Sequence, residues 1–452
     1  MASAQTLDLP KQLINTQVQK LCQQGNNYAL RGDIERAIAY YTQAIALASD
    51  CVAAYCERGK ALLALKDYPQ AAIDYTTALK LSPAHPVAEA GLARVYYAQK
   101  DYPAALVACN RAIQRDPDNT DLYHCRALIN TKLGDYPGIL VDCKFMLERQ
   151  PHDVVARWLN ARAHFQLGND RLAIFNFTQY LNLRSDDCYA YYYRGICYER
   201  VGNAHLAVTD LNSAIDLQHD VALFYRRRGR IRQRLGDLTG AMSDFDRTIA
   251  LDPSQGQVYL HRANIYINRG DYIQALSECS QAIYLNPQLI TAHYQRGVIH
   301  TEIGNLHAAL ADYHHLIQLA PQDLNAYIQR SWIYFRHGEY PAVMTDCNRV
   351  LEVDRNSVPA NYLMGIVQSL SGFKQEAVFN FSKVLDSQPS FICALYHRGL
   401  LYHDLKYEDK AMSDFNLARS IQTQSLDVVT TNRDETGLYA EGLALYYLGQ
   451  PD

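Results

Sequence analysis

A short run near the middle of the sequence holds six arginines, and three of them have a helical spacing. Arg226, Arg230 and Arg234 are four residues apart, so on an α-helix they would share one face. Like charges at this spacing repel each other, and a counter-charge is expected to offset them. Two sources of that counter-charge stay open. One is an acidic side chain of this chain, with Glu199 and Glu302 as candidates, and the other is a bound acidic segment or carboxylate.

The sequence has no motif that indicates an enzyme. The phosphate-binding loop GxxxxGKS/T, the dinucleotide-binding GxGxxG, the hydrolase motif GxSxG and the metalloprotease motif HExxH are all missing. The 15 histidines are scattered, and the adjacent His314 and His315 would point apart on a helix. We therefore expect no catalytic residues, no metal site and no cofactor.

The elements that position the arginines are set by an internal repeat. Windows with the same pattern begin at Val18 and recur every 34 residues, twelve times in all, the last beginning at Ile392. The eighth position of each window is Gly, Ala or Ser. The twentieth position is Ala in ten windows, with Ile139 and Val343 as the exceptions. Residues this small let two helix backbones approach closely.

Turn-forming residues divide each window into two helices. The fifteenth position is Gly in nine windows, a residue favoured just after a helix. The next position is Asp or Asn in nine windows, residues favoured just before a helix. Pro at the thirty-second position ends the second helix in seven windows. Each window is therefore predicted to be a helix, a tight turn, a second helix and a loop.

This pattern resembles the tetratricopeptide repeat (TPR) family over residues 18 to about 421, in its period, small-residue positions, aromatic positions and terminal Pro. The resemblance implies an all-α solenoid of helix-turn-helix repeats, wound into a right-handed superhelix with a concave groove lined mainly by first helices. Openings such as Tyr191 to Gly195 look like an Arg-Gly variant found in bacterial, including cyanobacterial, TPR proteins.

The register of the repeat predicts how the chain is organised. We expect an N-terminal extension over residues 1–17 and twelve contiguous repeats over 18–425. A loop is expected at 426–434, followed by a C-terminal capping helix at 435–452 that forms a partial thirteenth repeat. Residues 435–450 are apolar around most of a helix, which predicts self-association or partner docking there. The alternative is that this helix buries both of its faces within the chain.

Two positions of the repeat change together. The seventh position is Arg in eight windows, and the twenty-third is Asp or Glu in the same eight. Because positions that change together imply contact, we predict a partly buried ion pair between the two helices of each of these repeats. The predicted pairs are Arg58–Asp74, Arg126–Asp142, Arg194–Asp210, Arg228–Asp244, Arg262–Glu278, Arg296–Asp312, Arg330–Asp346 and Arg398–Asp414. Arginines with such partners are not available to an anionic ligand.

The family resemblance implies that positions two, five, nine, twelve and thirteen of each first helix face the groove. Aromatic residues occupy several of these positions: Trp158, Tyr192, Tyr294, Trp332, Phe335 and Tyr362, besides Phe165 and Tyr396. Such side chains would offer a large rigid surface to a bound peptide, or else would pack between neighbouring helices. The first six, with Arg226, Arg230 and Arg234, are the predicted partner-binding residues, and Trp332 is expected to reach the same ligand as the arginines.

These features predict a non-enzymatic protein-binding adaptor or assembly scaffold. It would hold an extended or helical segment of a partner protein in its groove, with an acidic segment as one form of that partner. The alternative is a helical-repeat RNA-binding protein, which the arginines would suit. A net charge of −4, from 43 Lys and Arg against 47 Asp and Glu, disfavours nucleic acid. A clamp for chaperone tails is unsupported, since of its positions only Asn26 matches.

The cysteine content and the absence of long apolar runs indicate where in the cell the protein is expected. The 11 cysteines are an odd number and form no CxxC pair, which favours a reducing environment. The start, MASAQTLDLPKQL, lacks a basic stretch followed by an apolar run, and no apolar run is long enough to span a bilayer. Cysteines that recur at the twenty-fourth position, Cys109, Cys143, Cys279 and Cys347, are expected in the core. We expect a cytoplasmic protein without a membrane span.

Overall fold

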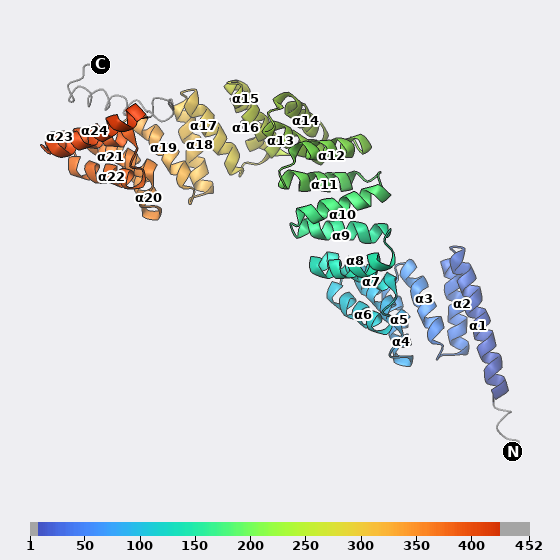
Figure 1. Ribbon diagram of the computed structural model, residues 1–452. Coiled ribbons are helices and arrows are strands. Elements are labelled where there is room, and N and C mark those ends of the chain that lie inside the picture. Colours follow the sequence, from blue (N-terminus) through green and yellow to red (C-terminus); the bar gives the residue numbers. More distant parts are fainter. Residues whose placement is uncertain (1–7, 425–452) are drawn as a thin grey trace. The chain divides into compact units, whose positions relative to one another are not determined.

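The computed structural model describes residues 8–424, and the side chains of residues 13–421. Within that range all regular elements are α-helices, twenty-four in succession (Figure 1). The predicted all-α solenoid of helix pairs is confirmed, with no β-strand in the described part. The loop expected at 426–434, and the helix and association surface expected within 435–452, lie outside the described residues.

From Val52 onward, the first helix of each pair begins at the first residue of a repeat window. In chain order the helices are α1 (Asp8–Leu30), α2 (Ile34–Leu47), α3 (Val52–Ala64), α4 (Tyr68–Leu81), α5 (Pro86–Ala98), α6 (Tyr102–Arg115), α7 (Thr120–Leu133), α8 (Tyr136–Arg149), α9 (Val154–Gln166), α10 (Asp170–Leu183), α11 (Cys188–Arg200), α12 (Ala204–Leu217), α13 (Ala222–Arg234), α14 (Leu238–Leu251), α15 (Gly256–Asn268), α16 (Tyr272–Leu285), α17 (Ile290–Glu302), α18 (Leu306–Leu319), α19 (Leu324–Arg336), α20 (Tyr340–Val353), α21 (Val358–Leu370), α22 (Lys374–Ser387), α23 (Ile392–Asp404) and α24 (Glu408–Gln424).

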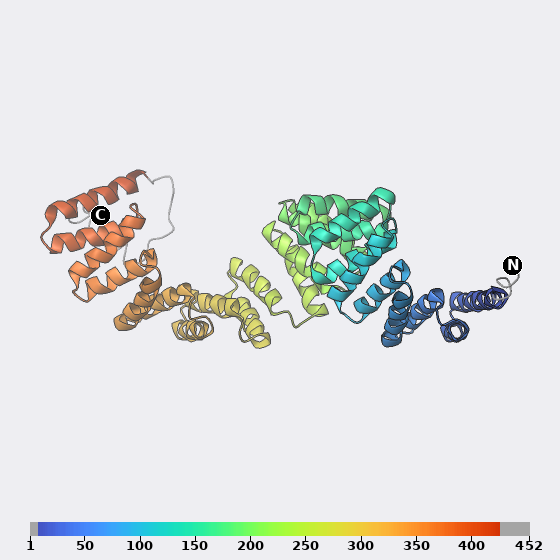
Figure 2. The same ribbon diagram turned by 90° about the horizontal axis from the view of Figure 1, so that it is seen from below.

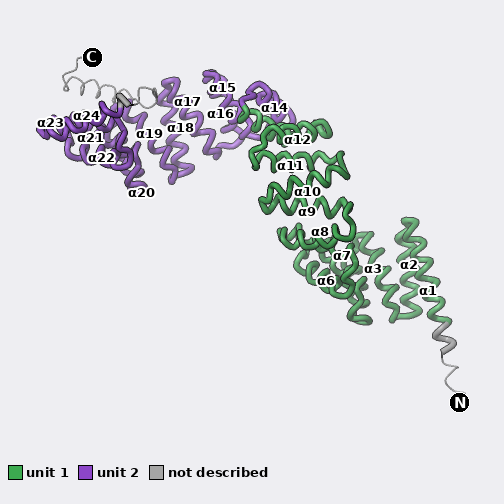
Figure 3. The backbone as a smooth tube through the Cα atoms, viewed as in Figure 1, with its two compact units in different colours: residues 1–235 green, residues 236–452 purple. Residues whose placement is uncertain are grey.

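The chain divides into two compact units, residues 1–235 and 236–452, called unit 1 and unit 2 below (Figure 3). Within each unit, consecutive helices pack side by side (Figures 1 and 2). First helices of neighbouring repeats also contact each other, as α3 does with α5 in unit 1 and α19 with α21 in unit 2. Second helices of neighbouring repeats approach each other less closely in the described part. The first helices therefore form the concave side of each unit.

The turn inside each repeat needs one residue in the left-handed backbone conformation. The nine glycines predicted at the fifteenth position all have a positive φ, between 73° and 87°. The three repeats without this glycine place a lysine in the same conformation: Lys66, Lys100 and Lys406, with φ of 62°, 65° and 66°. A residue with a Cβ pays for this conformation with about 1–2 kcal/mol, so the three lysine turns are strained.

Replacing Gly134 by Ala is expected to lower the free energy of unfolding by about 1 kcal/mol, because φ there is 76°. An added Cβ would meet no atom within 4 Å, so the backbone alone sets the cost. The reverse change, Lys66→Gly, should raise stability by up to about 1 kcal/mol. Urea denaturation of both variants measures the two changes, and the idea of strained turns fails if they shift stability in the same direction.

The residue after this turn caps the second helix in most repeats, as predicted. The Asp33 and Asp101 side chains accept hydrogen bonds from the backbone N–H groups of Arg36 and Ala104, at 3.2 and 3.1 Å. Asn169 differs, because its side chain makes no capping hydrogen bond.

Small residues bring the two helices of a repeat together. Ala37, Ala71 and Ala105 at the twentieth position are fully buried. The four cysteines predicted in the core are buried as well. Burial raises the pKa of the Cys143 thiol to about 12, so this thiol stays protonated and is a poor nucleophile.

Candidate ligand-binding groove

The predicted ion pairs are present between the helices of the repeats. Nε and Nη2 of Arg194 donate to Oδ2 and Oδ1 of Asp210 at 2.8 and 2.7 Å, and the aspartate is buried. Seven of the eight pairs are confirmed: Arg58–Asp74, Arg126–Asp142, Arg194–Asp210, Arg262–Glu278, Arg296–Asp312, Arg330–Asp346 and Arg398–Asp414. The eighth, Arg228 with Asp244, has one member in each unit and stays a prediction.

These clusters have a third member that the repeat pattern did not predict. In six of the seven confirmed pairs, Nη1 of the arginine also contacts the second helix of the preceding repeat, as from Arg194 to Thr178 Oγ1 at 3.1 Å and from Arg126 to Asn110 Oδ1 at 2.8 Å. The partner is always at the twenty-fifth position of the preceding repeat. Its residue type varies, so no single residue recurs there that would reveal the contact in the sequence. These arginines are thus bound on both sides and belong to the framework of the repeat.

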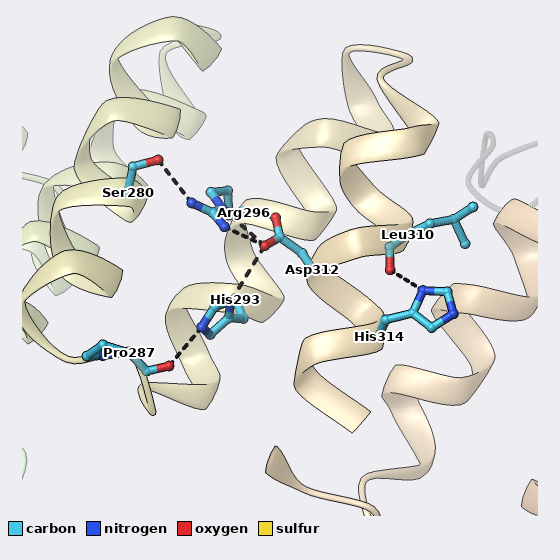
Figure 4. Close-up of polar contacts among 7 residues, drawn as sticks. All are labelled: Ser280, Pro287, His293, Arg296, Leu310, Asp312 and His314. Carbon is cyan, nitrogen blue, oxygen red and sulfur yellow. Dashed lines mark hydrogen bonds and ion pairs between the residues drawn. The ribbon is translucent and has the colours of Figure 1, made fainter. Parts of the chain in front are cut away.

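Figure 4 shows such a cluster in unit 2. Nη2 of Arg296 donates to Asp312 Oδ1 at 2.7 Å, and Nη1 donates to Ser280 Oγ at 3.3 Å. His293 Nδ1 lies 3.5 Å from the same aspartate oxygen. Burial opposes the ionisation of Asp312, but the hydrogen bonds from His293 and Arg296 outweigh it and hold the pKa of Asp312 below its ordinary value.

The adjacent histidines of this region point apart, as predicted. His314 Nδ1 lies 2.7 Å from the Leu310 carbonyl oxygen (Figure 4). The His315 ring centre, in contrast, is 4.5 Å from that of His293. The described residues hold no group of three or more His, Cys, Asp or Glu side chains suited to a metal ion.

The arginine face on α13 is partly offset from within unit 1. Glu199 of α11 binds Arg227 Nε at 2.6 Å and also binds Arg234, which is 58% exposed. For Arg234, the counter-charge is therefore an acidic side chain of this chain, which is the first of the two sources considered. Arg230 makes no hydrogen bond or ion pair with any described residue, and Glu302 belongs to the other unit.

Two of the six predicted partner-binding aromatics are buried instead, as is Tyr396 at another groove position. Tyr192 is only 8% exposed and packs on Phe224, with ring centres 5.3 Å apart. Tyr362 is 4% exposed and packs on Phe391 at 5.0 Å. Their positions match the expected groove pattern, but large neighbouring side chains cover both rings. These two tyrosines hold helices together and present no ring face to a ligand.

The other four predicted aromatics are half-buried at the groove positions, Trp158 in unit 1 and Tyr294, Trp332 and Phe335 in unit 2. Trp332 and Phe335 pack edge to face, with ring centres 6.0 Å apart. The predicted arginines Arg226, Arg230 and Arg234 are all in unit 1. That they share one ligand with Trp332 stays a prediction.

Hollows in unit 1 lie along the predicted groove positions. The larger one, of about 550 Å³, is the Arg94 hollow, formed by α3, α5 and α7 and lined by Leu63, Arg94, Tyr97, His124 and Leu128 among others. Another, of about 410 Å³, is the Arg162 hollow, lined by Trp158, Arg162, Gln166, Tyr189 and Tyr193 among others. Arg94 and Arg162 were not among the predicted partner-binding residues, although both occupy the ninth position of their repeats, which is a predicted groove position.

Charge is distributed unevenly between the two sets of first helices. In repeats one to seven, the five groove positions hold eight cationic residues, Lys60, Arg94, Lys132, Arg162, Arg200, Arg226, Arg230 and Arg234, against the carboxylates Asp121 and Glu199. In repeats eight to twelve they hold Arg336 against Glu302 and Asp404. The net charge of −4 thus conceals a cationic first-helix face in unit 1, called the unit 1 groove below.

None of the described helices combines the length and apolar character needed to cross a membrane. No curated protein sequence matches the chain.

Several solved structures are similar to this chain, with TM-scores below 0.5. The C-terminal part of a TPR repeat-containing protein from Cytophaga hutchinsonii has a TM-score of 0.48 and 16% identity, over 52% of this chain and 97% of that one. Yeast Tom70 has a TM-score of 0.38 and 14% identity, over 91% and 96%. YrrB, a TPR protein with an unusual peptide-binding site, has a TM-score of 0.36 and 18% identity, over 44% and 97%.

Family models described as tetratricopeptide repeat match at both ends of the described chain. They cover residues 22–86 and 62–129 in unit 1, and residues 256–289, 290–323 and 394–424 in unit 2. These matches coincide with helix pairs that begin at the predicted window starts. The chain therefore belongs to the tetratricopeptide repeat family.

Proposed function

We propose that the protein is a non-enzymatic adaptor or assembly scaffold, and that its unit 1 groove holds an extended or helical acidic segment of a partner protein. The observation behind this proposal is the excess of cationic residues at the groove positions of repeats one to seven. Proteins of the tetratricopeptide repeat family generally act as interaction scaffolds and not as enzymes.

The groove cations are a different set from the framework arginines. Arg58, Arg126 and Arg194 are held by carboxylates of their own repeats, whereas Arg94, Arg162 and Arg230 make no ion pair with a described residue. Cations without a counter-ion attract carboxylates, and they set the orientation of an acidic segment more than its total affinity. The half-buried rings beside them supply the apolar contact area.

Single-stranded RNA is the competing ligand, because cations and aromatic rings also suit nucleic acid. The family and the net charge favour a protein partner, since acidic residues elsewhere on the chain repel a long polyanion. The two ligands differ in salt dependence, which is steeper for RNA because many counterions are released at once.

Fluorescence anisotropy tests the proposal on the full chain. A labelled peptide of alternating Glu and Leu should bind at least about tenfold more tightly than its Gln and Leu counterpart. Arg94→Glu should weaken that binding by about tenfold, while the matched control Arg336→Glu, at a groove position of unit 2, should leave it unchanged. Tighter binding of oligouridine than of the acidic peptide, or equal effects of the two variants, would overturn the proposal.

A further inference from the structure

The Arg162 hollow encloses a cation among aromatic rings. Cζ of Arg162 lies 4.0 Å from the centre of the Tyr193 ring, and 5.9 Å from the ring centres of both Trp158 and Phe165. Arg162 and Trp158 belong to α9, and Tyr193 belongs to α11, so two successive repeats build this arrangement. The ring faces favour a cation beside them, and they hold the guanidinium at the wall of a cavity of about 410 Å³.

This guanidinium lacks the partner that the framework arginines have. Its Nη1 is buried and makes no hydrogen bond, and no described carboxylate lies within ion-pair distance of it. A buried N–H group without an acceptor lowers stability, because it has lost its hydrogen bonds to water and gained none in the protein. An oxygen atom entering the hollow would remove that cost.

The one carboxylate that lines this hollow forms hydrogen bonds with other groups. Asp187 accepts hydrogen bonds from the backbone N–H groups of Tyr189 and Ala190 at 2.9 and 3.1 Å, and from the Tyr180 hydroxyl at 2.8 Å. It therefore caps α11 and is not the counter-ion of Arg162. A second cation is nearby, since Arg200 lies 4.7 Å from the centre of the Phe165 ring while it pairs with Asp170.

We propose that the Arg162 hollow is a subsite for a carboxylate attached to an apolar or aromatic group. The guanidinium would bind the carboxylate oxygens, and Trp158, Tyr189 and Tyr193 would contact the apolar part. This inference rests on the proposed function and adds a defined chemistry at one place in the unit 1 groove. The carboxylate belongs either to an Asp or Glu side chain or to the C-terminus of the partner.

Trp158 gives the experiment an internal reporter, because the chain has only 2 tryptophans. In the full-length Trp332→Phe protein, the remaining indole fluorescence reports on the hollow. The probes are N-acetyl-Glu-Phe-amide for a side-chain carboxylate, N-acetyl-phenylalanine for a C-terminal one, and N-acetyl-Gln-Phe-amide as the neutral match. At least one carboxylate probe should give a saturable change, with an affinity about tenfold above that of the neutral probe. The better carboxylate probe identifies the source.

Variants separate a subsite from a general effect of charge. Arg162→Gln should abolish the preference for the carboxylate, and Arg162→Lys should keep part of it, since an ammonium group lacks the two-pronged geometry. Arg157→Gln is the control on the same helix, because Arg157 binds the Pro151 carbonyl oxygen and does not line the hollow. It should leave the preference unchanged.

Two results would overturn the subsite. One is equal binding of the acidic and neutral probes to the protein that retains Arg162. This test does not depend on whether an Arg162 variant folds. The other is an unchanged preference in a folded Arg162→Gln protein. Either result leaves the Arg94-dependent binding of the long acidic peptide in place, whereas loss of that binding contradicts the proposed function itself.

Discussion

Unit 1 is expected to lose about 3 kcal/mol of its free energy of unfolding when Asp210 is replaced by Ala, because Arg194 then stays in the interior without its carboxylate. The arginine side chain is 15% exposed, so water replaces the lost partner poorly. Burial raises the pKa of Asp210 even though Arg194 offsets part of the effect, which shows how unfavourable this place is for a lone charge. Urea denaturation measures the loss, and hydrogen exchange in α11 and α12 locates it.

The natural repeats supply the control for this prediction. Repeat three has Leu92 and Ala108 at the two positions, and both are buried. The double variant Arg194→Leu with Asp210→Ala copies that combination, and should recover more than half of the stability lost in the single variant. A single variant within about 1 kcal/mol of the original protein would show that the pair is not effectively buried.

Replacing Gly399 by Ala should destabilise unit 2 by about 1–3 kcal/mol through overpacking. An added Cβ would lie 2.4 Å from Cε1 of Phe415, a ring that is 1% exposed. The same substitution at Gly195, also at the eighth position, meets no atom closer than 3.3 Å. There it should be neutral or stabilising by up to about 1 kcal/mol, since Ala favours helix more than Gly.

The cause of this contrast is the residue at the twenty-fourth position, which differs between the two repeats. It is Phe415 beside Gly399 and the smaller Leu211 beside Gly195. Phe415→Cys should therefore relieve the clash in the Gly399→Ala protein, so that the double variant is less destabilised than the sum of the two single ones. Thermal unfolding of the original protein, the two single variants and the double variant completes this double-mutant cycle. Strict additivity would show that the ring is not the obstacle.

Sequence patterns predicted the parts of the fold that recur. The period, the left-handed turn glycines and the seven confirmed ion pairs each appear in many repeats, so one chain acts as its own alignment. The burial of the four cysteines was also predicted from the repeat pattern. The reason why these repeats have cysteine at the twenty-fourth position was not. Their repeats have Ala or Ser at the eighth position, whereas most glycines there face an aromatic ring, as Gly59 faces Tyr75.

Features that occur once were not predictable in the same way. Whether a ring at a groove position is covered depends on its particular neighbours, which is why Tyr192 and Tyr362 were assigned to the groove and lie in the core. Arg162 stands out only when its missing counter-ion is seen, because the spacing of residues places a side chain but does not show what fails to contact it. The predicted link between the α13 arginines and Trp332 involves both units and stays a prediction.

The spacing of the interacting positions has a consequence for how such a gene can be reshuffled. The arginine and its acid, and the glycine and its aromatic ring, are each 16 residues apart on opposite sides of the turn within one repeat. A crossover in the loop between repeats keeps both partners together, whereas a crossover in the turn separates them. Whole repeats therefore keep their pairs in duplication and exchange, whereas exchanged half-repeats keep them only when both repeats carry the same combination. The contact to the preceding repeat tolerates such exchange, because Thr, Asn and Ser all serve as its acceptor.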